Sequence, residues 1–132
     1  MKKLFAWVAV IAAGAGTYYW LSQKPTDAAN ASEITMPALS VLAAEGKPVF
    51  DGTCAACHGV NLLGTNEGPP LLHAFYKPGH HGDGAFVNAI QNGSVRHHWP
   101  FGDMPPQPHI TGDQIVRIIT YVREVQRANG FE

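Results

Sequence analysis

The sequence predicts a small all-α domain of three to five helices, preceded by a hydrophobic helix at the N-terminus. Three observations lead to this prediction. Apolar residues recur at helical spacing, no stretch alternates convincingly between apolar and polar residues, and a charge-free run near the start has the length of a membrane span. The 132 residues include ten prolines and fourteen glycines, which imply long loops and a small hydrophobic core. Something besides side chains should therefore fill the centre of the domain.

The most clearly predicted helix lies near the C-terminus. Residues 111–114 form a capping-box pattern, in which Thr111 precedes the helix and Gln114 takes its third position. Four apolar residues follow at i, i+3, i+4 and i+7 spacing and predict one buried stripe: Ile115, Ile118, Ile119 and Val122. Three arginines should lie largely off that stripe: Arg117, Arg123 and Arg127. Gly130 is a stop signal for this helix.

Another helix is expected before residue 54. It should begin at about Val41 or Gly46 and end at Cys54, with Val49 and Phe50 as its apolar residues. Pro48 fits the first turn of a helix that starts near Gly46, where its missing N–H does no harm.

A third helix is expected from about Asp83 to Asn92. Asp83 can cap its N-terminus, and Gly93 suits its end. Its apolar face consists of Phe86, Val87 and Ile90.

The first 21 residues predict a membrane anchor or a signal peptide. A basic start is followed by a charge-free run from Leu4 to Leu21, which would span about 27 Å as a helix, close to the roughly 30 Å hydrocarbon core. A signal peptide could be cleaved near residues 29–31. The length of the run and the aromatic belt at residues 18–20 favour the anchor. We expect a bacterial inner-membrane protein whose domain lies in the periplasm, or a soluble periplasmic protein if cleavage occurs.

Residues 22–40 are polar and Ala-rich, with Pro25 and Pro37 among them. They predict a flexible tether between the anchor and a domain formed by residues 41–132. An extended arm packed on the domain is the alternative. The formal net charge is −1 and charged residues make up 14% of the chain, which argues against nucleic acid as a partner, because phosphate binding needs a clustered basic face.

The two cysteines of the chain lie in Cys54-Ala55-Ala56-Cys57-His58, which is the signature of covalent haem attachment. The two thiols add across the vinyl groups of the porphyrin, and the adjacent His58 becomes the proximal iron ligand. A dithiol redox motif would need a βαβ context, and a structural zinc site would need two more suitably spaced ligands. A buried pair of structural thiols is the third alternative. The sequence therefore predicts one haem c, attached through Cys54 and Cys57.

Residues 41–132 resemble the class I cytochromes c, which are small all-helical monohaem proteins. Residues 68–71 resemble the family's Gly-Pro-x-Leu stretch, so the resemblance implies that the Pro69 carbonyl accepts a hydrogen bond from the His58 ring. Residues 101–106 resemble the Met-Pro loop, which implies that Met104 is the distal ligand. Residues 119–123 resemble the terminal helix, which crosses the first helix near a glycine and an aromatic residue, here Gly46 and Phe50.

With His58, Met104 would complete the iron ligands, and its soft thioether would stabilise ferrous iron. The alternative for Met104 is a methionine that packs in the hydrophobic core without binding iron, and His98 is the rival distal ligand. Trp99 is expected to pack on the haem or to donate to a propionate through its indole N–H; a contact with a partner protein is the other option.

A histidine-rich region, His80-His81 and His97-His98, lies between Cys57 and Met104. Together with His73 and His109 they could bind copper or zinc at the surface. We favour the alternative, in which they are solvated or face the propionates.

The resemblance implies an electron carrier and not an enzyme, because His58 and Met104 would leave the iron no open site. We expect redox protein partners such as a dehydrogenase, an oxidase or another cytochrome. Two alternatives stay open: a cytochrome subunit of a larger oxidoreductase or oxidase, and a haem enzyme or gas binder with a labile distal ligand.

Overall fold

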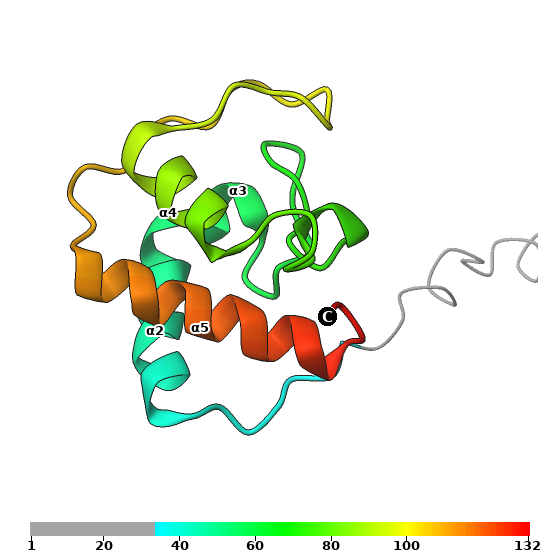
Figure 1. Ribbon diagram of the computed structural model, residues 1–132, viewed down its shortest axis with the longest axis vertical. Coiled ribbons are helices and arrows are strands. Elements are labelled where there is room, and N and C mark those ends of the chain that lie inside the picture. The colour runs from blue at the N-terminus through cyan, green and yellow to red at the C-terminus, as the bar shows by residue number, and fades with distance from the viewer. Residues whose placement is uncertain (1–33) are drawn as a thin grey trace, which may run out of the picture. The chain divides into compact units, whose positions relative to one another are not determined.

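A computed structural model describes residues 34–132 of the chain. These residues form four α-helices and one 3-10 helix, with no strand among them and a single isolated bridge between Ser94 and Met104 (Figure 1). The helices follow in the order α2 (Val41–Thr53), α3 (Ala55–His58), the 3-10 helix η2 (Ala74–Tyr76), α4 (Asp83–Asn92) and α5 (Gly112–Ala128). The all-α prediction is confirmed for this part of the chain.

Helix α5 begins with the predicted capping box. The Thr111 hydroxyl accepts from the Gln114 amide at 3.3 Å, and the Gln114 side chain accepts from the Thr111 amide at 2.9 Å. The four residues of the predicted stripe are all buried. The helix ends at Ala128, two residues before Gly130, which has a positive φ of 78°.

Helix α2 begins at Val41, so the alternative start near Gly46 is wrong. The Ser40 hydroxyl caps the helix by accepting from the Ala43 amide at 3.3 Å. Pro48 consequently lies inside the helix and not in its first turn. It cannot donate to the carbonyl four residues earlier, a cost that the packing of α2 must offset.

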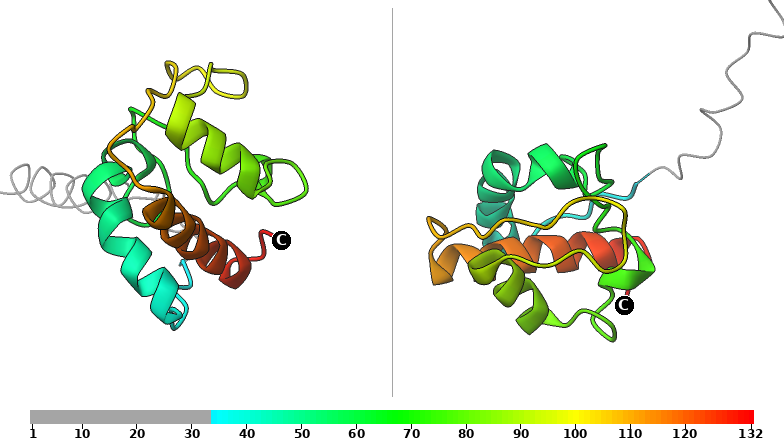
Figure 2. Two further views of the ribbon diagram at one scale, coloured as in Figure 1. Left: turned by 60° about the vertical axis from the view of Figure 1, so that its left-hand side comes forward. Right: turned by 90° about the horizontal axis from the view of Figure 1, so that it is seen from above.

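Helices α2 and α5 cross in close contact (Figures 1 and 2). At Gly46, a Cβ atom would lie 2.1 Å from the Arg117 carbonyl oxygen, so any larger residue would force the helices apart. The buried rings of Phe50 and Tyr121 meet beside this crossing, with centroids 5.5 Å apart. The crossing at Gly46 and Phe50 is therefore present as the family resemblance implies.

Helix α4 spans the predicted residues, but Asp83 is not its cap. Gly82 occupies the capping position and offers no side chain, while Asp83 is the first residue within the helix. The carboxylate instead accepts from Nε of Arg123 at 2.8 Å. An aspartate at this position can accept from the free amides of the helix end or from a cation distant in sequence, and Asp83 pairs with the buried Arg123 guanidinium.

Arg123 is buried, which contradicts the prediction that it lies off the buried stripe; its exposed fraction is 6%. Besides Asp83, its guanidinium donates to the carbonyl oxygens of Tyr76 at 2.7 Å and His81 at 2.6 Å. Neighbouring Gln126, fully buried, donates to the Leu71 carbonyl at 2.8 Å. The long loop between α3 and α4 has carbonyls that no helix satisfies, and these two side chains supply the donors.

Residues 34–40 form an extended arm that lies against the domain. Ile34 and Leu39 pack on the core. The Asn129 side chain exchanges two hydrogen bonds of 2.9 Å with the backbone of Thr35. For these residues the arm alternative describes the structure; residues 22–33 of the predicted tether lie outside the described part.

Within residues 34–132, no helix has both the length and the apolar character needed to cross a membrane. The predicted anchor or signal peptide of residues 1–21, with its aromatic belt, lies outside the described residues.

We predict that Arg123→Met lowers the free energy of unfolding by about 3 kcal/mol, because buried carbonyls lose their donors. The matched control is Arg117→Met, which removes only an exposed ion pair with Glu45 and should cost less than about 1 kcal/mol. Urea unfolding of the haem-loaded protein, followed by circular dichroism, measures both. Equal losses would show that the Arg123 network does not hold the loop.

Candidate haem-binding site

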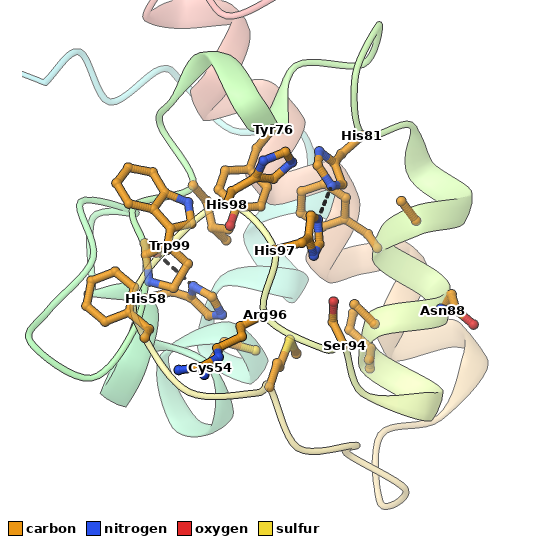
Figure 3. A pocket seen from close by; sticks show the side chains of 18 of the residues that line it. Cys54, His58, Tyr76, His81, Asn88, Ser94, Arg96, His97, His98 and Trp99 are labelled. Atoms are coloured by element: carbon orange, nitrogen blue, oxygen red, sulfur yellow. Dashed lines mark hydrogen bonds between the residues drawn. The ribbon is translucent and has the colours of Figure 1, made fainter.

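A cavity of about 320 Å³ lies between the helices and the loop that follows α4 (Figure 3). Five of the six predicted site residues line it: Cys54, His58, Pro69, Trp99 and Met104. Cys57 does not line the cavity and is exposed. Much of the remaining wall is apolar, with Phe50, Leu71 and Ile118 among its members.

The attachment pentad forms the corner between α2 and α3. Cys54 is the residue between the two helices, and its carbonyl accepts from the amides of Cys57 at 3.2 Å and His58 at 2.9 Å. Both thiols are free. Burial, and secondarily the charge of Cys57, raises the pKa of the Cys54 thiol to about 11, so this thiol stays protonated at neutral pH.

The ring of His58 is oriented by the carbonyl oxygen of Pro69, which lies 2.9 Å from Nδ1. Since a carbonyl can only accept, Nδ1 carries the proton and Nε2 keeps its lone pair for a metal. Burial lowers the pKa of His58, and the hydrogen bond to Pro69 opposes this effect only in part. The lowered pKa keeps the ring neutral at neutral pH. This is the contact that the family resemblance implies.

Two small residues bring the Pro69 loop against the pentad. A Cβ atom on Gly68 would lie 2.8 Å from the Cβ atom of Cys57, so only glycine allows this approach. The Thr65 hydroxyl donates to the Cys57 carbonyl at 2.9 Å. No pattern in the sequence predicts this role of Thr65, because the contact depends on how the loop folds back.

Met104 enters the cavity from a loop that is closed at its base. Its amide and carbonyl exchange hydrogen bonds of 2.9 and 3.0 Å with Ser94, directly after α4. The Arg96 amide donates to the Asp103 carboxylate at 3.0 Å one step further along the loop. Met36 lies in the arm, 40% exposed, and does not line the cavity.

Trp99 contributes a buried donor that the chain does not satisfy. Its Nε1 atom has no hydrogen-bond partner among residues 34–132. Burial raises the pKa of the Tyr76 phenol, and the nearby indole of Trp99 partly opposes that rise. The phenol and the indole nevertheless form no hydrogen bond. A buried N–H without a partner costs about 1–3 kcal/mol, so this atom suits a cofactor that brings an acceptor, such as a propionate.

Three histidines also line the cavity, at its rim: His81, His97 and His98. Partial burial lowers the pKa of His98, and repulsion from the neighbouring histidines lowers it further. The ring of His98 stacks on Phe75 with centroids 4.3 Å apart, and its Nε2 lies 3.1 Å from Nε2 of His80. The rival ligand is therefore near the site but held by contacts of its own.

The residues present fit a covalently attached haem. Two free thiols, an oriented neutral imidazole, a thioether and an unpaired indole N–H surround or adjoin one largely apolar cavity. One thiol, the imidazole and the thioether line the cavity and the second thiol lies three residues further along the pentad, so the fit rests on the chemistry of the donor set.

Comparison with known proteins agrees with this chemistry. The family model described as Cytochrome c matches residues 43–126, from α2 to near the end of α5. No curated protein and no solved structure matches the chain. The family binds covalent haem c, and its members transfer electrons. The matched residues make up more than half of the chain and include the pentad, Pro69 and Met104, and the chain belongs to the cytochrome c family.

Proposed function

We propose that the protein is a single-electron carrier whose haem c is attached through Cys54 and Cys57 and ligated by His58 and Met104. The observation that carries the proposal is that His58 and Met104 come from different elements and line one cavity beside the attachment pentad. A bound haem c supplies an iron that gains or loses one electron.

His58 has a fixed ring and a free Nε2 lone pair. The Pro69 bond fixes the tautomer, and it also raises the basicity of the ring as a ligand. Thr65 and Gly68 hold that carbonyl in place through their contacts with Cys57.

Met104 is favoured over His98 as the distal ligand. Its backbone is fixed by both hydrogen bonds to Ser94, and Pro105 and Pro106 stiffen the chain that follows. His98 is engaged by Phe75 and His80. A thioether ligand raises the reduction potential by stabilising ferrous iron.

A haem with both axial positions filled has no open site for a substrate. The chain's residues then have to hold the cofactor, exclude water and keep both ligands in place during electron transfer. We propose that the donor and acceptor are redox proteins. With few charges on the chain, docking should rely on apolar contacts with a modest electrostatic rim.

We also propose that residues 1–21 attach the protein to the bacterial inner membrane with the haem domain in the periplasm. Support comes from the charge-free run of the sequence and the two lysines before it.

Met104→His should lower the reduction potential by on the order of 100 mV, part of the roughly 0.8 V range that axial ligands span. Met36→His is the matched control, because Met36 lies outside the cavity, and should leave the potential unchanged. Spectroelectrochemical titration measures both. An unchanged potential in the Met104 variant would mean that another residue is the distal ligand.

Cys57→Ala should greatly reduce the yield of haem that stays on the chain after acid–acetone extraction, since one of two thioether anchors is lost. Pyridine haemochrome spectra report the number of thioether bonds. Full retention with an unaltered haemochrome spectrum would reject attachment through Cys57.

Deletion of residues 1–31 behind a cleavable export signal should move the red protein from the membrane to the soluble periplasmic fraction. The described domain begins at residue 34 and stays intact in this variant. If the truncated protein still sediments with membranes, a surface of the domain or a partner holds it there.

A further inference from the structure

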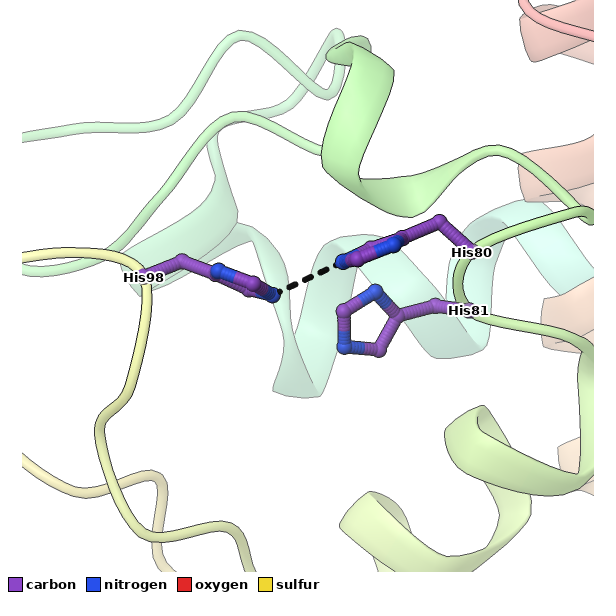
Figure 4. A group of neighbouring side chains, drawn as sticks. All are labelled: His80, His81 and His98. Carbon is purple, nitrogen blue, oxygen red and sulfur yellow. Dashed lines mark hydrogen bonds between the residues drawn. The ribbon is translucent and has the colours of Figure 1, made fainter.

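Two pairs of histidines meet at the rim of the haem cavity. His80 and His81 precede α4 in the chain, whereas His97 and His98 follow it. Ring centroids lie 4.7 Å apart for His80 and His81 and 4.3 Å apart for His97 and His98. Figure 3 shows His81 facing His97, and Figure 4 shows His80 facing His98 with His81 beside them.

The pairing of His81 with His97 leaves an electrostatic conflict. Nδ1 of His81 contacts the Phe75 carbonyl, and Nδ1 of His97 lies 2.8 Å from the Val95 carbonyl. A carbonyl only accepts, so each Nδ1 carries the proton and each neutral ring keeps a lone pair on Nε2. These two Nε2 atoms face each other at 3.3 Å. Two lone pairs at this distance repel unless a proton or a metal cation lies between them.

The spacing of the nitrogens suits a metal. Two imidazole ligands of a tetrahedral ion with bonds of about 2.0–2.1 Å have nitrogens about 3.3 Å apart. The His81–His97 pair has this separation, and Nε2 of His80 lies 3.1 Å from Nε2 of His98. One nitrogen from each of His80, His81 and His98 lies within 4.8 Å of the others. Because the His80 side chain is exposed, it can rotate and bring its nitrogen closer to those of His81 and His98.

The contacts around the rings also suit ligation. A metal-binding histidine commonly donates its other N–H to a backbone carbonyl, as His81 and His97 do. The nearby carboxylate of Asp83 is paired with Arg123. The donor set is therefore purely imidazole, which suits copper and zinc and does not suit calcium or magnesium.

We propose that His80, His81, His97 and His98 bind one divalent transition-metal ion, with Cu²⁺ held more tightly than Zn²⁺. The order follows from the general preference of nitrogen sites for Cu²⁺ over Zn²⁺. Three of these histidines line the rim of the haem cavity. Because the site uses His98, it rests on the proposed function, in which Met104 and not His98 is the distal haem ligand.

Calorimetric titration of the ferric haem-loaded protein with Zn²⁺, and separately with Cu²⁺, tests the proposal. The wild type should bind one equivalent of each ion. The double variant His80→Asn/His97→Asn removes one ligand from each pair and should weaken binding by about 100-fold or more, since loss of a mere supporting contact already costs 10–100-fold. The control His109→Asn changes an exposed histidine outside the cluster and should bind like the wild type.

Electron paramagnetic resonance of the Cu²⁺ form should show hyperfine coupling to several nitrogens in the wild type and the control. The absorption spectrum of the haem reports whether each variant is folded. Should the double variant lose that spectrum, the single variant His80→Asn, whose side chain lies outside the cavity, takes its place. The proposal is overturned if no saturable binding occurs, or if binding in a folded variant equals that of the wild type.

Discussion

The close crossing of α2 and α5 at Gly46 is the contact on which the rest of the domain depends. Helix α2 ends at the attachment pentad, so its position sets where both thiols and His58 lie. Helix α5 carries Arg123 and Gln126, whose donors hold the carbonyls of the loop between α3 and α4. A side chain at Gly46 would separate the two helices, and both sets of contacts would shift together. Backbone proximity at one residue thereby couples the haem anchor to the loop that orients it.

Polar groups that the chain leaves unsatisfied mark where other groups bind. The buried indole N–H of Trp99 lacks an acceptor among residues 34–132, and the Nε2 atoms of His81 and His97 face each other at 3.3 Å. Trp99 and His97 lie on the long loop between α4 and α5, which also carries Met104, whereas His81 precedes α4. Folded chains rarely tolerate such groups without a partner, because each costs free energy that folding must offset. The same loop therefore serves the proposed haem site and the proposed metal site.

Much of this could be predicted from the sequence, since it depends on local order. The capping box at Thr111 and the stripe from Ile115 to Val122 define α5 without reference to the rest of the chain. The pentad indicates its own chemistry, and the family resemblance singled out Pro69 and Met104, both of which line the cavity. The errors concern residues whose partners are distant in sequence. Arg123 was expected outside the buried stripe, and Asp83 was expected to cap α4, because periodicity does not show which carbonyls a buried guanidinium will meet. The histidine pairs join residues 16 and 18 positions apart, which only the folded loops bring together.

The most direct test of the account is the absorption spectrum of the exported protein in both oxidation states, with carbon monoxide added to the reduced form. We predict low-spin haem in both states, a weak far-red sulfur-to-iron band in the ferric protein, and no response to carbon monoxide, because in the proposed carrier His58 and Met104 would fill both axial positions. A high-spin spectrum, or prompt binding of carbon monoxide, would contradict the account. The iron would then have an open position, and a haem enzyme or gas binder would replace the electron carrier as the function of this chain.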